Sequence, residues 1–324
     1  MNPRVSIGLP VYNGAKFLNE GIESLLGQAF GDLELIISDN ASDDGTAEIC
    51  QDFVKHDKRV RYVRNSSNLG AAANYQRVFH LAQGEYFKWA AHDDICMPGF
   101  IDACLDVLEK DDSVRLAYCK AVAIDDKSRL MHEVPSCSNL DNPDPIKRFS
   151  AVLQLGETLP IWGLMRRKEL RTTGLLGPFV AHDRPLLAEI ALSGKLHSVD
   201  RCLFKHREHN GRSVHQFDWR LPRLAIPWYD SSRSPRFHFP AWRLFREYEQ
   251  AILRAPAPKL AKVRAQGLLL LFTIKNFRQL GGDALTGMVQ CATNVSDNWT
   301  PSCTHNHFSK IVESITHYRA NFRV

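Results

Sequence analysis

Two adjacent carboxylates follow an apolar stretch in the first third of the sequence. Residues 86–91 are apolar or aromatic apart from one lysine, and the run stops at His92-Asp93-Asp94. Like charges side by side at the end of a buried strand are unfavourable unless a cation offsets them. Mg²⁺ and Mn²⁺ prefer carboxylate and phosphate oxygens. We therefore predict a cation site here, the alternative being a loop in which Asp93 caps the next turn.

Three further clusters carry residue types that can do chemistry. Residues 39–46 (DNASDDGT) predict either a capped turn or a contact of Asp39 or Asn40 with the edge of a nucleobase. Asp183 opens an apolar stretch, where an acid either stabilises a helix N-terminus or acts as a base. Residues 206–213 (HREHNGRS) suit phosphate or a metal, and equally an exposed basic loop.

The elements that must position these clusters alternate along the first 124 residues. Strands are predicted at 5–11, 33–38, 60–64, 86–91 and 116–124, and helices at 16–28, 46–56, 74–82 and 100–109. This alternation indicates an α/β fold with a mainly parallel sheet covered on both faces. Ligands bind such sheets beyond the carboxyl ends of the strands. Because Tyr12-Asn13, residues 39–44 and residues 92–94 each follow a predicted strand, we expect them to converge on one site.

The pattern changes in the second half of the chain. A helix is predicted at 145–155, residues 160–210 are mixed, and a helix at 259–280 is expected to pack as core. We divide the chain into residues 1–215, a catalytic domain, and 216–324, a helical region rich in arginine and aromatic residues. Its composition suits an acceptor-site lid, a membrane-surface contact, or helices packed on the catalytic domain or on a second subunit. Its aromatic residues include Trp219, Trp228, Phe237, Phe239, Trp242 and Phe245.

The bulk composition excludes several classes of protein. The 324 residues are 44% hydrophobic and 24% charged, which is ordinary for a globular chain. A net charge of +5 does not indicate a nucleic-acid partner, and we expect none. The eight cysteines lack CxxC spacing and predict reduced thiols of a cytoplasmic protein without a secretion signal. Peripheral contact with the inner face of the membrane and homo-oligomer formation stay open as alternatives.

Taken in order, these motifs resemble the family 2 glycosyltransferases of the GT-A fold. Residues 10–13 (PVYN) are similar to the family's opening P-x-Y-N, and residues 39–46 to its D-D-x-S-x-D-x-T. Residues 68–70 (NLG) resemble N-x-G, and residues 84–86 (GEY) match G-E-Y. His92-Asp93-Asp94 sits at the D-x-D-D motif, His182-Asp183 at Glu-Asp, and residues 207–209 (REH) at R-x-H. The resemblance covers about residues 3–215.

The resemblance implies a Rossmann-like α/β sheet flanked by helices, and an inverting enzyme. The enzyme would move a sugar from a UDP-, dTDP- or GDP-sugar to a hydroxyl of a glycan or lipid-linked acceptor, in polysaccharide or glycolipid synthesis. It implies Asp183 as general base, and Mn²⁺ or Mg²⁺ held by Asp93, Asp94 and His209. The implied nucleotide-sugar contacts are Pro10, Tyr12, Asn13, Asp39, Asn40, Asn68, Asn74, His92, Asp93 and Arg207.

The sequence departs from the family pattern at four places. Asn40 replaces the second Asp of the base-binding pair, and Ala91 replaces the first Asp of D-x-D-D. His182 stands where the family has Glu, and alanines at 71–73 replace an arginine that precedes the Asn matching Asn74. These changes leave open a catalytically weakened binding or scaffold protein. A nucleotidyltransferase would need a Gly-rich basic loop in residues 5–13, and a Rossmann dehydrogenase would need GxGxxG after the first strand. The sequence has neither pattern there, which argues against both classes.

Overall fold

The computed structural model describes residues 2–212, 222–232 and 240–275. The predictions for Trp219, Phe237, Phe239 and residues 276–280, and the predicted domain boundary after residue 215, lie outside this range. The strands are β1 (Val5–Val11), β2 (Leu33–Asp39), β3 (Val60–Arg64), β4 (Tyr86–Trp89), β5 (Ile95–Cys96), β6 (Val114–Ile124), β7 (Leu130–Glu133), β8 (Leu164–Arg166) and β9 (Lys195–Arg207).

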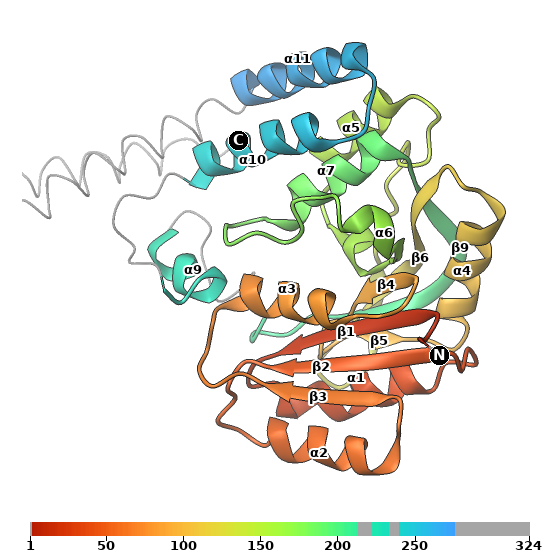
Figure 1. Cartoon of the computed structure of the whole chain (residues 1–324), viewed down its shortest axis with the longest axis vertical. Coiled ribbons are helices and arrows are strands. Elements are labelled where there is room, and N and C mark those ends of the chain that lie inside the picture. Colours follow the sequence, from red (N-terminus) through yellow and green to blue (C-terminus); the bar gives the residue numbers. More distant parts are fainter. Residues whose placement is uncertain (1, 213–221, 233–239, 276–324) are drawn as a thin grey trace, which may run out of the picture.

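Helices separate and follow these strands (Figure 1). They are α1 (Ala15–Leu26), α2 (Thr46–His56), α3 (Ala71–Leu81), α4 (Phe100–Lys110), α5 (Pro145–Leu153), the 3₁₀ turn η1 (Leu159–Trp162), α6 (Arg167–Leu170), α7 (Asp183–Ser193), α9 (Pro222–Tyr229), α10 (Pro240–Arg254) and α11 (Lys259–Lys275). In these ranges, no helix is both long enough and apolar enough to cross a bilayer.

The strands form one mixed sheet in the order β3-β2-β1-β4-β8-β6-β9-β5, with β7 paired to β6. The first four strands are parallel. β8 then runs antiparallel to both of its neighbours, and β9 returns parallel to β6. The predicted α/β class is confirmed, and its parallel character holds for β3-β2-β1-β4 and for the β6–β9 pair.

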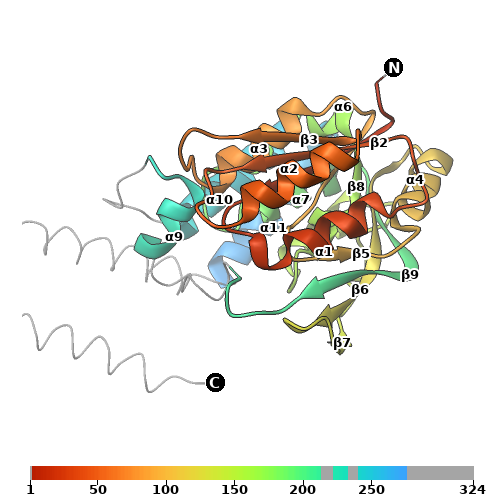
Figure 2. The same ribbon diagram turned by 90° about the horizontal axis from the view of Figure 1, so that it is seen from below.

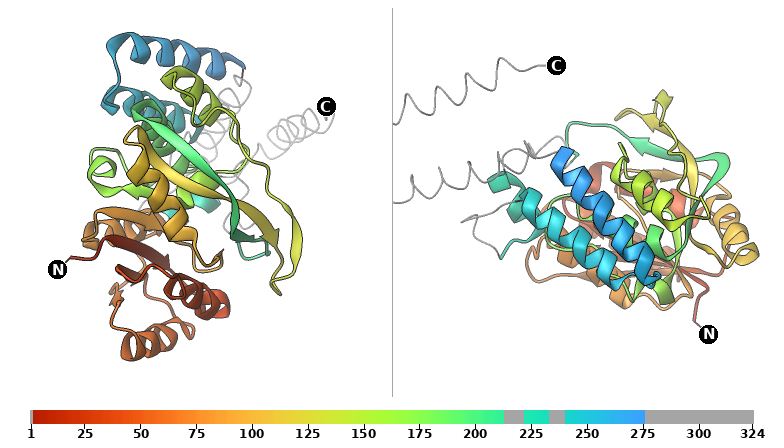
Figure 3. Two further views of the ribbon diagram at one scale, coloured as in Figure 1. Left: turned by 90° about the vertical axis from the view of Figure 1, so that its right-hand side faces the viewer. Right: turned by 90° about the horizontal axis from the view of Figure 1, so that it is seen from above.

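Helices cover both faces of the sheet, as the strand pattern predicted (Figures 2 and 3). Alternate residues of β2 point to opposite cores, because side chains alternate along a strand. Leu35 and Ile37 belong to a core with α1, α2 and α4, whereas Ile36 belongs to one with α3, α5 and α7. The second core continues into α10 and α11 through Tyr248, Ile252, Ala261, Ala265 and Leu269.

Sequence periodicity left residues 160–210 unassigned, and α7 and β9 are the two longest elements found there. Residues 185–192 of α7 are all buried, so the helix shows no apolar stripe to recognise. Strand β9 is thirteen residues long, but its pairing with β6 shifts register and its buried positions do not alternate. Both elements carry predicted site residues, Asp183 at the start of α7 and Arg207 at the end of β9.

The helix expected to pack entirely as core does so on one face only. α11 packs on α10 and α5 through its alanines and Leu269. Its opposite face exposes several large apolar side chains.

Candidate functional site

A cavity of about 1130 Å³ lies beyond the carboxyl ends of the parallel strands. It gathers side chains from the loops after β1, β4 and β9, and from α3, η1, α7 and α9. The predicted site residues that line it are Pro10, Tyr12, Asn13, Asn40, Asn68, Asn74, His92, Asp93, Asp94, Asp183 and His209. Asp39 and Arg207 are not among the lining residues.

The wall built by the β1–α1 and β2–α2 loops is a clamp of short polar contacts. The Asn13 N–H donates to Ser42 Oγ (2.9 Å), and the Gly14 N–H donates to Thr46 Oγ1 (3.0 Å). Asn13 returns the contact, since its Oδ1 accepts from the Asp43 N–H (3.0 Å). Side chains of one loop thus satisfy backbone donors at the start of α1, which otherwise lack partners. The capped-turn interpretation of residues 39–46 therefore describes the folded loop.

Asp39 serves that clamp from inside the protein. Its side chain is fully buried, with Oδ1 accepting from the Ser42 N–H (2.8 Å) and Oδ2 from the Tyr62 hydroxyl (2.7 Å). These partners hold the carboxylate behind the cavity wall. The contact of Asp39 with a nucleobase stays a prediction.

Both ends of the Asn40 side-chain amide form hydrogen bonds with the loop before α3. Its Oδ1 accepts from the Leu69 N–H (2.9 Å), and its Nδ2 donates to the Gly70 carbonyl (3.3 Å). These backbone partners decide which end is oxygen and which is nitrogen. The same amide accepts from Asn65 and donates to Asn68 Oδ1, both at 2.8 Å. An Asp here could not donate, which gives a physical reason for this departure from the family pattern.

Asn74 joins α3 to the sheet in a similar way. Its side chain is buried, with Oδ1 accepting from Ser38 Oγ (2.6 Å) and Nδ2 donating to the Ser38 carbonyl (2.8 Å). Asn74 reaches the cavity at its base, while Asn68 and Tyr12 line it nearer the solvent.

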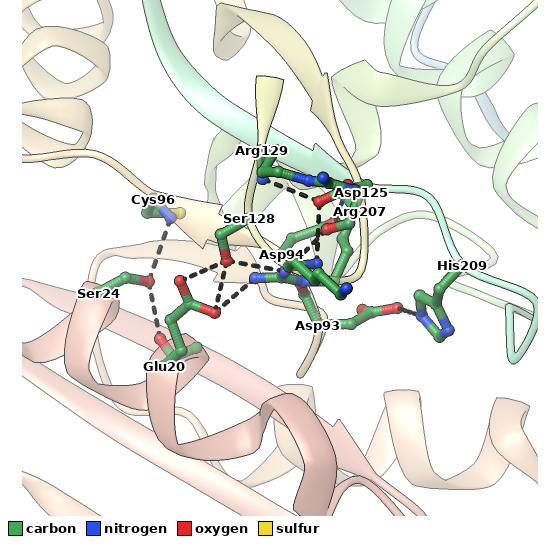
Figure 4. A network of polar contacts seen from close by, with 12 residues as sticks. Glu20, Ser24, Asp93, Asp94, Cys96, Asp125, Ser128, Arg129, Arg207 and His209 are labelled. Atoms are coloured by element: carbon green, nitrogen blue, oxygen red, sulfur yellow. Dashed lines mark hydrogen bonds and ion pairs between the residues drawn. The ribbon is translucent and has the colours of Figure 1, made fainter. Parts of the chain in front are cut away.

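Asp93 and His209 form the pair best placed for a cation. Asp93 Oδ2 lies 2.9 Å from His209 Nε2, and both residues line the cavity (Figure 4). Burial opposes ionisation of Asp93, but the charge of His92 and the hydrogen bond from His209 lower its pKa below the usual value. Among the described residues, no three His, Cys, Asp or Glu side chains converge as a metal cage. A hard oxygen and an imidazole suit Mg²⁺ or Mn²⁺ that takes its remaining ligands from a diphosphate.

Asp94 lines the cavity and holds β9, and its predicted contact with a cation stays a prediction. Its Oδ1 accepts from the Arg207 N–H (2.9 Å), and both of its oxygens lie within 3.2 Å of His206 Nδ1. Burial disfavours the charged imidazole, yet the charge and hydrogen bond of Asp94 raise the pKa of His206. His206 Nε2 is buried and has no hydrogen-bond partner within the described part of the chain. His206 belongs to the residues that line the cavity.

Arg207 does not line the cavity but joins neighbouring elements of the fold. Its side chain is only 1% exposed. The guanidinium donates to Glu20 Oε2 (2.6 Å), Ser128 Oγ (2.9 Å) and the Asp93 carbonyl (2.7 Å), as Figure 4 shows. The predicted contact of Arg207 with substrate phosphate is therefore not supported by its position. Lys16 and Arg212 do line the cavity and offer positive charge in its place.

Asp183 lies at the start of α7 and faces the same cavity. One of its oxygens accepts from the Thr158 hydroxyl, and the other accepts from the Arg184 N–H (3.0 Å). The carboxylate is thus oriented both by the helix N-terminus and by η1. The helix-start and base interpretations are compatible, since only one proton-accepting lone pair need remain for an acceptor hydroxyl.

His182, beside Asp183, is enclosed by aromatic rings. Its ring centroid lies 5.9 Å from Tyr75 and 5.1 Å from Tyr229. Burial lowers the pKa of His182, and the Asp183 charge only partly opposes that shift. Nδ1 lies 2.8 Å from the Gly177 carbonyl and must donate, because a carbonyl only accepts. His182 is therefore a neutral ring that supports this wall.

Helix α9 closes the cavity between these two sides. The Ala181 N–H points at the Tyr229 hydroxyl (3.4 Å), and Ser231 Oγ donates to the Asn68 carbonyl (2.6 Å). A Cβ added at Gly70, whose φ is +83°, would lie 2.7 Å from the Tyr229 carbonyl oxygen. This close approach requires glycine and ties the C-terminal region to the loop before α3.

Comparison with known proteins decides the family. Residues 6–170 match the sequence profile of glycosyl transferase family 2, which spans β1 to α6. The chain belongs to this family. An uncharacterized glycosyltransferase of Rickettsia conorii is 31% identical over 215 residues, covering 64% of this chain and 34% of that protein. The chain thus spans about a third of that family member's length.

Solved structures of similar fold extend the likeness beyond the matched residues. TarS of S. aureus, in complex with UDP-GlcNAc, has a TM-score of 0.61 at 16% identity and covers 85% of this chain and 73% of its own. PcManGT of Pyrobaculum calidifontis, a mannosyltransferase in complex with GDP-Man and Mn²⁺, has a TM-score of 0.55 at 17% identity, covering 100% and 82%. At this identity the likeness establishes the GT-A fold of this family 2 member.

Several lining residues have no signal in the sequence. Thr158 directly precedes η1, Trp162 ends it, and Tyr75 belongs to α3; no motif marks these residues. Tyr229 follows Trp228, one of the aromatic residues named in the C-terminal region, but the sequence does not indicate that it lines the cavity. Their contribution depends on how distant elements pack.

Proposed function

We propose that this chain is an inverting glycosyltransferase that moves a sugar from a nucleoside diphosphate sugar to an acceptor hydroxyl. The observation that carries the proposal is one cavity that holds both the Asp93–His209 pair and the Asp183 carboxylate. The nucleotide-sugar complexes of TarS and PcManGT support this donor class.

The residues on the loop side of the cavity are proposed to bind the donor. Tyr12, Asn13 and Asn68 line the part that suits a nucleoside. Lys16 and Arg212 line the cavity and would supply positive charge to the diphosphate. Mg²⁺ or Mn²⁺ would be held by Asp93 and His209, where it supplies charge stabilisation to the departing diphosphate.

Asp183 is proposed to be the general base. The acceptor O–H gives its proton to the carboxylate, while the acceptor oxygen forms a bond to the anomeric carbon. The bond from that carbon to the diphosphate oxygen breaks, and its electron pair leaves with the diphosphate. Attack from the face opposite the leaving group inverts the configuration. Thr158 and the α7 N-terminus hold the carboxylate for this step.

The wider role proposed is synthesis of a polysaccharide, glycolipid or related glycoconjugate. The test is a melting-temperature panel of UDP-, dTDP- and GDP-sugars with and without Mn²⁺, because a bound ligand stabilises the folded state by mass action. At least one nucleotide sugar should raise the melting temperature, and more strongly with Mn²⁺. A protein that responds to none of them would instead fit the weakened scaffold.

Asp93→Asn tests the cation assignment. The substitution should lower metal-dependent turnover on the order of 100-fold and remove the extra Mn²⁺-dependent shift in melting temperature. Asp52→Asn, on the exposed surface of α2, is the matched control and should change neither quantity. Wild-type turnover in Asp93→Asn would contradict the assignment.

A further inference from the structure

The exposed face of α11 carries a continuous apolar stripe. Its large side chains are 55–71% exposed, although leucine and isoleucine are normally buried. The stripe consists of Leu260, Val263, Gly267, Leu270, Leu271 and Ile274. At 3.6 residues per turn, these positions fall within an arc of about 100° and extend for roughly 20 Å.

The opposite face of the same helix is already used. Ala261, Ala265 and Leu269 pack in the core against α5 and α10. Because both faces are apolar, α11 lacks the polar outer face that a surface helix of a soluble protein normally shows. The stripe is therefore a surface that requires an explanation beyond folding.

The charges on α11 indicate the kind of partner. The helix holds Lys259, Lys262, Arg264 and Lys275, and between residues 259 and 275 there is no acidic residue. By helical spacing, Lys259 borders one edge of the stripe and Lys275 the other, whereas Arg264 pairs with Asp144 (3.8 Å). An apolar stripe edged by cations is complementary to a bilayer with anionic headgroups.

The same charges argue against a second copy of this helix. The spacing 260, 263, 267, 270, 274 alternates three and four residues, as in a coiled coil. Pairs of that kind are matched by opposite charges beside the seam. Two α11 helices would instead place only basic or neutral residues there, including Lys259, Arg264 and Gln266.

We infer that the outer face of α11 binds an anionic lipid surface, with the apolar stripe entering the headgroup region and the flanking cations meeting phosphates. This inference stands apart from the proposed activity, since it uses no residue of the cavity.

The test is co-sedimentation of the full chain with vesicles. Phosphatidylcholine vesicles containing phosphatidylglycerol should bind the protein at least tenfold more strongly than pure phosphatidylcholine, because an anionic surface attracts the lysines beside the stripe. Added salt should weaken the binding by screening. Equal binding to both vesicle types, or none to either, would overturn the inference.

Substitutions on the stripe separate the possible occupants. Leu270→Gln/Leu271→Gln/Ile274→Gln should reduce binding to anionic vesicles tenfold or more, with an unchanged melting temperature, because the side chains are exposed. Leu130→Gln/Met131→Gln on β7, equally exposed, is the matched control and should bind as wild type. If the stripe variant leaves vesicle binding intact and instead converts a dimer to a monomer in sedimentation velocity, a second copy occupies this face and the inference fails.

Discussion

The two sides of the cavity are built differently. The loop side, from Tyr12 to Asn74, consists of segments that directly follow parallel strands, joined by hydrogen bonds between loop side chains and backbone. The opposite side joins η1, the start of α7 and α9 through ring contacts and through hydrogen bonds between these elements. Local motifs mark the first side because hydrogen bonds between loop side chains and backbone require particular residue types. The second side depends on the placement of whole helices, so few of its residues can be recognised in advance.

The largest expected effect is on the helix side, at the proposed base. Asp183→Asn should lower turnover on the order of 1000-fold, since an amide cannot take up the acceptor proton. Titration calorimetry should show nucleotide-sugar binding close to wild type, because the donor contacts lie on the loop side. Persistent transfer would place the base elsewhere and remove the catalytic distinction between the two sides.

The stability of the helix side can be tested at an ion pair between α7 and α10 that lies outside the cavity lining. Glu189 of α7 is buried and pairs with Arg254 of α10 at 2.9 Å. Arg254→Met should reduce the free energy of unfolding by about 2 kcal/mol, below the usual range for a broken buried pair because Arg254 is partly exposed. Denaturant unfolding measures this change.

The pH dependence gives the same variant a second readout. Burial raises the pKa of Glu189, and Arg254 opposes that shift, so the pKa should rise further when the arginine is absent. The folded state then binds the proton more tightly than the unfolded state, and the lost stability should return as pH falls. Glu189→Gln/Arg254→Met should recover most of the loss at neutral pH. A double variant as unstable as the single one would show that the charge pair is not what matters.

The loop side should be sensitive to a one-atom change. Asn40→Asp replaces a donor with an oxygen that faces the Gly70 carbonyl and Asn68 Oδ1, so we expect a loss of about 1–3 kcal/mol in stability. Nucleotide-sugar affinity should fall as the loop before α3 loosens. Asn139→Asp, exposed and remote, is the matched control for the chemical change. Unchanged stability in Asn40→Asp would mean that the loop does not depend on this amide.

The smallest expected effect lies where the two sides meet. Burial raises the pKa of Tyr229 to about 12, so its hydroxyl stays protonated at any working pH. Tyr229→Phe removes only a long contact with the Ala181 N–H, and stability should change by about 0.5–1 kcal/mol. A rise in KM for the acceptor with unchanged donor KM would assign Tyr229 to the helix side. The reverse pattern would assign it to the loop side.

Sequence reasoning located the longer strands and the helices of residues 5–124 within a few residues, because their periodicities are regular, but it missed the short strands β5 and β7. It selected Asp93, His209 and Asp183, which line one cavity. It predicted that Arg207 contacts the donor and that Asp94 binds the cation. In the structure, Arg207 pairs with Glu20 and Asp94 with His206. The type of a charged residue does not show whether its side chain faces a ligand or a buried partner. Only the packing of β9 distinguishes these roles.

Residue type and spacing alone determined the α/β class, the strand-end positions of the polar motifs and the likeness to family 2, because these depend on local hydrogen bonding and alternation. Tertiary structure decided which polar groups face the cavity, how α7 and α9 complete it, and that α11 buries one apolar face while exposing the other. Those outcomes depend on contacts between separate elements, such as Thr158 with Asp183, Ala181 with Tyr229 and Asp94 with Arg207, which no local pattern encodes.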